Sequence, residues 1–256
     1  MNACRGILAV AGFQLRRLLA PQRLLLALVG AAFPAAVMLA VRQVAGDLDR
    51  DFAVVLLYAL VPEAVCMLGL LVTMCPVVAD ELERGTWQHV VVRPGGRRSL
   101  LFGTFLAAVA WTAVVALVAL GLSLVAAGLP GSGRLAAILG ALVGLSCLGR
   151  AALFALPAVI VPKRALVASV AAALVVEYLA GFLPAIINQL TVSLRLRSLL
   201  VDWMGWHRQL PAELKLLIDP QPAAVQIAAV IVLTATLLGV AAAILGRRQF
   251  PPAEES

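Results

Sequence analysis

Apolar residues along this chain gather into six long runs, separated by short polar or charged segments. A helix needs about 20 mostly apolar residues to cross the hydrocarbon core of a bilayer. The runs therefore predict six transmembrane helices, near Leu24–Val41, Phe52–Val78, Leu100–Gly128, Leu135–Val161, Ala165–Leu183 and Ala223–Leu245. The expected fold is an all-α polytopic membrane protein, in which residues 1–256 form a single transmembrane domain.

Two further segments are amphipathic rather than uniformly apolar. Near the N-terminus, helical spacing places one set of residues on a common face: Ile7, Val10, Ala11, Leu15, Leu18 and Leu19. A second set falls mostly off that face: Arg5, Gln14, Arg16 and Arg17. This pattern predicts an N-terminal helix lying in the membrane interface, with a simple extension of the first span as the alternative.

The second amphipathic segment is the long connection before the last span, from Pro184 to Pro222. It mixes apolar residues with Trp203 and Trp206, and tryptophan favours the boundary between membrane and water. We expect short helices that dip into the outer face or lie on it, and a flexible loop is the alternative.

Composition supports the membrane assignment and excludes several other classes. Of the 256 residues, 63% are hydrophobic and 13% are charged, whereas soluble domains have about 25% charged residues. The net charge of +7 comes without nucleic-acid motifs, so no nucleic-acid partner is expected. There is no phosphate-binding glycine loop ending in lysine, so the chain itself should bind no ATP or other cofactor.

Lys and Arg are unequally divided between the two sides of the predicted bundle. One side has Arg5, Arg16, Arg17, Arg23, Arg84, Arg93, Arg97, Arg98, Lys163, Arg164, Arg247 and Arg248. The other side has Arg42, Arg50, Arg134, Arg195, Arg197, Arg208 and Lys215. Because short cytoplasmic loops carry the excess of basic residues, the first side and both termini should be cytoplasmic. The expected location is the plasma (inner) membrane, with multiple passes.

Three charged residues lie inside the predicted spans: Glu63, Arg150 and Glu177. A central charge costs roughly 2.5–3.5 kcal/mol on insertion scales, so each should face protein or water. At about 1.5 Å per residue, Arg150 and Glu177 lie roughly 16 and 18 Å above the inner ends of their helices. We predict an ion pair between them, with a position along a translocation pathway as the alternative. Glu63 lies nearer the outer side with no evident partner at its depth, so it faces a wet vestibule or is a protonated core residue.

The connection between the second and third spans is dense in charge and helix breaks. Asp80 and Arg84 can extend the second span as helix, Gly85 can end that helix, and Thr86 can cap a new one. Pro94 stops the new helix after one or two turns. The segment should thus hold a short helix, on which Trp87, Val90 and Val91 share one face.

This segment resembles the corresponding part of ABC-2 type transporter permeases. The resemblance rests on Glu81, Glu83, Gly85, Thr86, Pro94, Arg97, Arg98 and Gly103. It is reinforced by the six spans, the N-terminal helix and the basic C-terminal end, whereas Thr104 departs from the lysine that the family often has there.

The resemblance implies a permease subunit of an ABC exporter that is not itself an enzyme. Such a subunit would form the translocation pathway as a homodimer or heterodimer in the lipid bilayer, driven by a separate ATPase subunit that hydrolyses ATP. It would place a cytosolic coupling helix after the second span, and the candidate ATPase-coupling residues are Glu81, Glu83, Gly85, Thr86 and Trp87.

The alternative is a membrane-embedded enzyme or a structural membrane protein without an ATPase. A serine nucleophile at Ser146 would need a base, and the two histidines, His89 and His207, fall on opposite sides of the membrane in this topology.

Overall fold

The computed structural model describes residues 3–46, 49–83, 85–92, 95–128, 132–179, 191–206 and 221–248. Within these residues every regular element is a helix, as the sequence predicts. Five helical stretches are long and apolar enough to cross a membrane: Pro21–Val44, Arg50–Glu83, Gly96–Ala127, Ser132–Ile160 and Ala223–Arg247. The chain is thus a multi-pass membrane protein.

The predicted fifth span, Ala165–Leu183, is not among these five. Its described part consists of α9 (Ala165–Ala173) and the π-helical segment η4 (Leu174–Leu179), which follow a short 3₁₀ turn, η3 (Pro162–Arg164). Residues 180–190 lie outside the described part of the chain, so the length of this helix stays a prediction.

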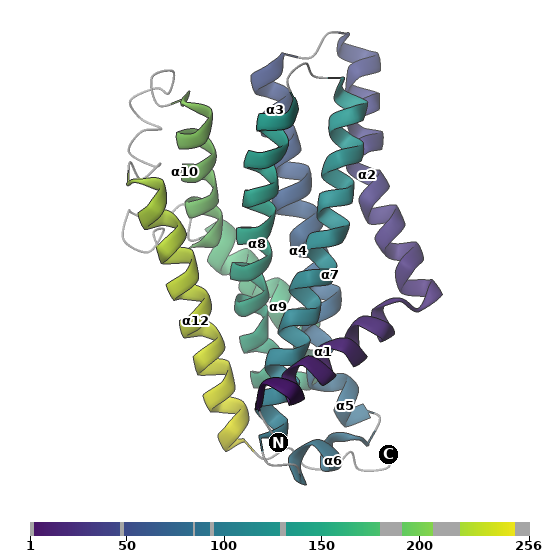
Figure 1. Cartoon of the computed structure of the whole chain (residues 1–256), viewed down its shortest axis with the longest axis vertical. Coiled ribbons are helices and arrows are strands. Elements are labelled where there is room, and N and C mark those ends of the chain that lie inside the picture. Colours follow the sequence, from purple (N-terminus) through teal and green to yellow (C-terminus); the bar gives the residue numbers. More distant parts are fainter. Residues whose placement is uncertain are drawn as a thin grey trace.

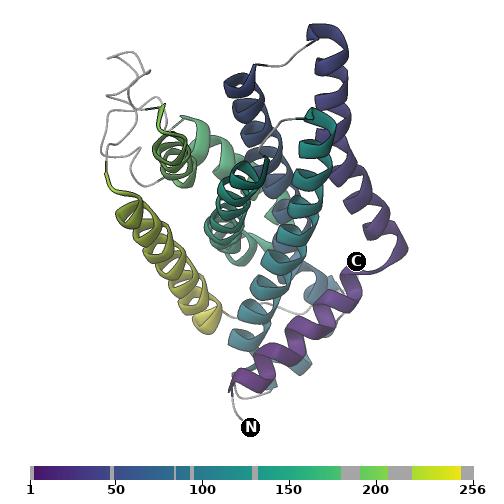
Figure 2. The ribbon, with the colours of Figure 1, turned by 45° about the horizontal axis from the view of Figure 1, so that its top comes forward.

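Helix α8 (Ser132–Ile160) lies at the centre of the bundle. It contacts α4, α7, α9, α10 and α12. From Leu142 to its C-terminal end, most of its residues are buried. Helices α2 (Pro21–Ala45) and α12 (Ala223–Arg247) lie at opposite edges, as Figure 2 shows, and expose many leucine, valine and isoleucine side chains. Such apolar exposure is appropriate to helices that face lipid.

The second long stretch is a helix whose regularity is broken twice, each time at a proline. It runs through α3 (Arg50–Tyr58), a π-helix η1 (Ala59–Val65), α4 (Cys66–Met74), a 3₁₀ turn η2 (Cys75–Val77) and α5 (Ala79–Glu83). Pro62 lies in η1 and Pro76 lies in η2. Proline lacks a backbone N–H and its ring displaces the preceding turn, so it disturbs the regular hydrogen-bond ladder.

The disturbance at Pro62 takes its carbonyl group out of the usual hydrogen bond to the N–H four residues on. The backbone N–H of Cys66 donates to the carbonyl oxygens of Val61 and Glu63, and passes over that of Pro62. The Pro62 oxygen is therefore available to side chains from another helix, in the middle of the bundle.

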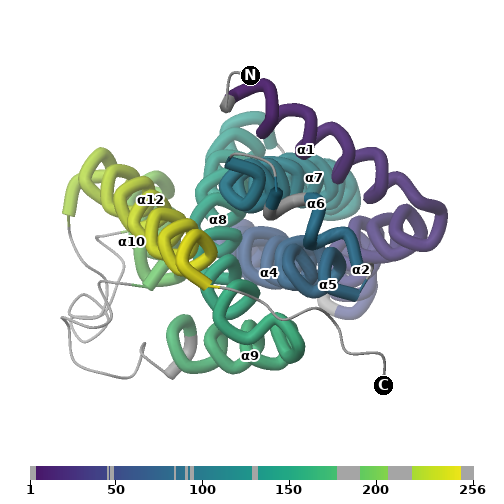
Figure 3. The backbone as a smooth tube through the Cα atoms, turned by 90° about the horizontal axis from the view of Figure 1, so that it is seen from below, coloured from purple at the N-terminus to yellow at the C-terminus, as the bar shows by residue number. Residues whose placement is uncertain are grey.

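Several helix ends meet at one end of the bundle, which we call the α6 end. They are the end of α5, the short helix α6 (Trp87–Val92), the start of α7 (Gly96–Ala127) and the end of α12 (Figures 1 and 3). Helix α1 (Ala3–Leu18) lies across the start of α7 at this end, where Gly103 allows it to approach closely (Figure 2). A Cβ atom at Gly103 would lie 2.7 Å from Val10 Cβ and 2.9 Å from the Ile7 carbonyl oxygen.

The buried face of α1 differs from the predicted face at two residues, Gln14 and Leu19. Ala11 and Leu18 are buried as expected, but so is Gln14, which the pattern placed off the apolar face. Leu19, expected on the apolar face, is more than half exposed just after the helix ends. The reason is that α1 rests on a protein surface as well as facing outward, and α7 covers the Gln14 side of the helix.

At the opposite end, α10 (Val192–Met204) inserts beside α8 from the rim toward the bundle interior. Its thirteen residues cover roughly 20 Å at about 1.5 Å per residue. At the rim, the Arg134 guanidinium donates to the Trp203 carbonyl (3.2 Å), and the Trp206 indole N–H donates to Asp51 (3.1 Å). Of the expected short helices in this connection, the structure describes α10, which dips inward; residues 207–220 lie outside the described part.

Candidate functional site

The sequence predicts functional residues in two places, and the first is the turn between α5 and α6. Gly85 has φ +68°, the left-handed conformation expected of a residue that ends a helix. Helix α6 begins two residues later at Trp87, and the Thr86 hydroxyl donates back to Glu81 Oε2 (2.5 Å). Arg84, Arg93 and Pro94 lie outside the described residues.

Trp87 holds α6 against the bundle. Its ring is buried in an apolar cluster with residues of α4, α7, α8 and α12. The Arg97 guanidinium lies 5.9 Å from the centre of the Trp87 ring, close enough for a cation–π contact. Arg97 Nη1 also donates to the carbonyl oxygens of Leu245 (3.3 Å) and Gly246 (3.0 Å), which belong to the last turn of α12. Those carbonyls lack helical partners, so a cation there is favourable.

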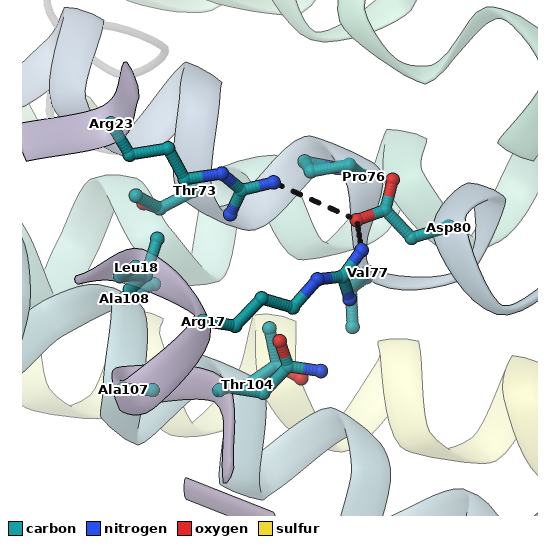
Figure 4. Close-up of a pocket in the computed structure, with 11 residues that line it drawn as sticks. Arg17, Leu18, Arg23, Thr73, Pro76, Val77, Asp80, Thr104, Ala107 and Ala108 are labelled. Atoms are coloured by element: carbon teal, nitrogen blue, oxygen red, sulfur yellow. Dashed lines mark hydrogen bonds and ion pairs between the residues drawn. The ribbon is translucent and has the colours of Figure 1, made fainter. Parts of the chain in front are cut away.

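Two arginines tie the N-terminal helices to α5. Figure 4 shows Arg17 and Arg23 extending toward the same carboxylate, that of Asp80. The distances to Asp80 Oδ2 are 2.5 Å from Arg17 Nη2 and 3.9 Å from Arg23 Nη2, and Arg17 Nη1 lies 4.0 Å from Glu81 Oε1. The cavity beside them measures only ≈ 10 Å³, so it holds no more than about one water molecule. We call these four residues the Arg17–Asp80 cluster.

The five candidate coupling residues thus divide into two groups. Glu81 and Trp87 are buried and hold the segment in place, whereas Glu83 and Gly85 are exposed and Thr86 is half-buried. Three exposed residues of α6 were missed by the sequence reasoning: Gln88, His89 and Val92. Their outward position follows from the burial of Trp87, because helical spacing then puts positions 88, 89 and 92 on the outer side of α6.

The second place is the set of charges inside the membrane-spanning helices. Arg150 is fully buried on α8 (0% exposed), and its Nη2 lies 2.6 Å from Glu63 Oε2 and 3.4 Å from Glu177 Oε2. The predicted neighbours Arg150 and Glu177 are within ion-pair distance. A role of these charges along a pathway stays a prediction.

The expectation that Glu63 has no partner at its depth was wrong. Counting from the predicted inner ends of the two spans, Val78 and Val161, puts Glu63 roughly 6 Å farther along its helix than Arg150, at about 1.5 Å per residue. An extended arginine side chain covers that distance. The guanidinium is also drawn toward η1 by the free carbonyl of Pro62, to which Arg150 Nη1 donates (2.5 Å).

Several uncharged groups complete this cluster. Ser146 donates to the Pro62 carbonyl (2.6 Å) and accepts from Arg150 Nη1 (2.7 Å). Tyr58 donates to Glu63 Oε1 (2.8 Å), and Arg150 Nη2 donates to Ser193 Oγ (2.9 Å). We call six residues the Arg150 cluster: the ionisable Glu63, Arg150 and Glu177, together with Tyr58, Ser146 and Ser193.

Sequence reasoning missed Tyr58 and Ser193, and weighed Ser146 only as a nucleophile. In the structure the Ser146 hydroxyl is engaged with Pro62 and Arg150, and His89 lies at the α6 end. His207 lies outside the described residues. Among the described residues no group of three or more His, Cys, Asp or Glu side chains is arranged to hold a metal ion.

Comparisons of the chain with protein-family models, with curated proteins and with solved structures found no match.

Proposed function

We propose that this chain is the permease subunit of an ATP-binding cassette exporter of the ABC-2 type. It forms the translocation pathway as a dimer, with an identical or related chain, and a separate ATPase subunit hydrolyses the ATP. In this proposal Ala165–Leu183 is the sixth span, the bundle lies in the plasma membrane, and the α6 end is cytoplasmic. Helix α1 then lies in the inner interface of the membrane.

The observation that carries the proposal is that α6 is packed against the bundle on one side and exposed on the other. It is a six-residue helix at the extreme end of the bundle, too short to be stable alone. Buried contacts of Trp87 support it from behind, while Val92 at its tip is 82% exposed. A short helix that is fixed on one side and exposes polar and apolar side chains on the other is suited to docking a protein partner.

The contacts of α5 and α6 also connect this end of the bundle to the long helices, so that a movement of α6 could be transmitted to them. Trp87 and Arg97 join α6 to α7 and α12, and the Arg17–Asp80 cluster joins α5 to α1 and α2. A displacement of α6 by a partner would therefore be carried to four membrane-associated helices together. Glu81 and Trp87 would position the docking surface, and Glu83 and Gly85 would contribute to the surface itself.

A matched pair of substitutions tests the docking surface. Val92→Asp changes an 82% exposed residue at the α6 end, and Val44→Asp changes a 91% exposed residue at the opposite end. We expect Val92→Asp to weaken co-purification with the proposed ATPase subunit by about tenfold or more, because losing a packed interface contact costs over about 1 kcal/mol. Val44→Asp should leave association and ATP turnover unchanged.

Equal effects of the two substitutions, or no effect of either, would contradict the assignment of α6 as the docking element. Failure of the unmodified chain to associate with any ATPase would contradict the transporter proposal as a whole.

A further inference from the structure

The two carboxyl groups of the Arg150 cluster, those of Glu63 and Glu177, lie at unequal distances from the arginines around them. Glu63 has Arg150 at 2.6 Å, the Tyr58 hydroxyl at 2.8 Å and Arg197 Nε at 3.8 Å. Glu177 has Arg150 only at 3.4 Å, through the same nitrogen that contacts Glu63. Among the described residues, both cations of the region therefore favour Glu63, and none pairs with Glu177 alone.

The surroundings of Glu177 are those of a neutral acid. Its side chain is 1% exposed, and within the described part of the chain its Oε1 is buried without a hydrogen-bond partner. An ionised carboxylate oxygen without a donor is very costly in a low-dielectric interior, whereas burying the carbonyl oxygen of a neutral acid without a donor costs far less. The other oxygen, Oε2, accepts from the Ser193 N–H (3.1 Å) and is hydrogen-bonded to Ser193 Oγ.

We propose that Glu177 is a proton-binding site inside the membrane-spanning bundle, linked through Ser193 to Glu63. A proton on Glu177 Oε2 is donated to Ser193 Oγ, and the Ser193 hydroxyl donates its own proton to Glu63 Oε2, 3.3 Å away. Ser193 Oγ also accepts from Arg150 Nη2 (2.9 Å). Its one donor and two acceptor sites are then all used, and one proton neutralises the second carboxylate.

Glu63 is the end of this hydrogen-bond chain that lies nearer the surface: its side chain is 10% exposed, whereas that of Glu177 is 1% exposed. Arg197 Nε lies 3.8 Å from Glu63, and the Arg197 side chain is 54% exposed. A proton that reaches Glu63 can pass to Ser193 as Ser193 passes its own to Glu177, and it can return by the reverse exchange. The other titratable side chains packed here among the described residues are Tyr58 and the thiols of Cys66 and Cys147.

Infrared spectroscopy of the full chain in lipid nanodiscs tests the proposal, with or without an ATPase. We expect the carbonyl band of a protonated carboxylic acid, which shifts to lower frequency in D2O. Glu177→Gln should abolish the band, and the exposed control Glu83→Gln should keep it. Absence of the band in the unmodified protein, or its survival in Glu177→Gln, overturns the proposal.

Thermal unfolding of the same variants provides a second measurement. Glutamine replaces a neutral acid without loss of charge, so Glu177→Gln should keep Tm within about 2 °C of that of the unmodified protein. Glu63→Gln removes the main counter-charge of Arg150 and should lower Tm clearly. If Glu177→Gln unfolds as easily as Glu63→Gln, or fails to fold, the ionised form of Glu177 is needed and the proposal is wrong.

Deuteration kinetics test the route. Ser193→Ala removes the link between the two carboxyl groups, so the D2O shift of the Glu177 band should appear more slowly than in the unmodified protein. An unchanged rate would overturn the connection through Ser193.

Discussion

The Arg150 cluster and the Arg17–Asp80 cluster join arginine to carboxylates at similar distances, 2.6 and 2.5 Å, but in different surroundings. Arg150 is fully buried at mid-bundle, whereas the side chains of Arg17, Asp80 and Arg23 are 14%, 23% and 32% exposed at the α6 end. Water screens a charge pair and solvates either partner left alone. The same pair of residue types should therefore dominate stability in one place and contribute little in the other.

The largest effect is expected from Arg150→Met. Removing this cation leaves Glu63 without its buried counter-charge and should cost about 3–5 kcal/mol. The measurement is thermal or denaturant unfolding in nanodiscs, with the exposed Arg5→Met as the control. Adding Glu63→Gln to Arg150→Met should recover part of the loss, because the unpaired charge is then gone. A double variant no better than Arg150→Met would show that packing, not charge, sets the cost.

A smaller effect is expected where α1 meets α7. Gly103→Ala places a methyl group against Val10 and the Ile7 carbonyl, which should separate the helices and cost about 1–3 kcal/mol. Gly121 lies on the same helix with no atom within 4 Å of the added Cβ, so Gly121→Ala should be neutral or slightly stabilising. Protease sensitivity of α1 and Tm measure the difference. Equal Tm values would mean that the charged cluster, rather than this close packing, holds α1 in place.

The smallest effect is expected from Arg17→Gln. The partly exposed pair with Asp80 should contribute about 0.2–1 kcal/mol, and less at high salt. Unfolding should be measured at low and at high salt. The difference in stability between Arg17→Gln and the parent protein should shrink at high salt, whereas Arg150→Met should stay destabilised at both. A loss for Arg17→Gln as large as that for Arg150→Met would remove the distinction between the two clusters.

The contacts of the Arg150 cluster could be predicted from the sequence only in part. Matching depths on adjacent helices brought Arg150 and Glu177 together. Glu63 could not be placed by depth alone, since its contact with Arg150 depends on the direction of the arginine side chain, which donates to the Pro62 carbonyl in the π-helix η1. Ser193 lies 43 residues beyond Arg150, in a connection whose path has no local signal.

At the α6 end, Gly85 and the start of α6 could be predicted from turn chemistry, which is local. The burial of Glu81 and Trp87 could not, since it depends on where α1, α7 and α12 end in space.

The sequence by itself determined the all-helical class, the long apolar stretches and the short helix after the second of them. These properties follow from hydrophobic runs and helix breakers, which act within a few turns of one segment. Only the tertiary structure decided which charges meet, which carboxylate lies closer to the shared arginine, and which side of α6 is free. Those outcomes depend on the rotation, depth and contacts of helices far apart in the chain, where a shift of one turn exchanges one set of partners for another.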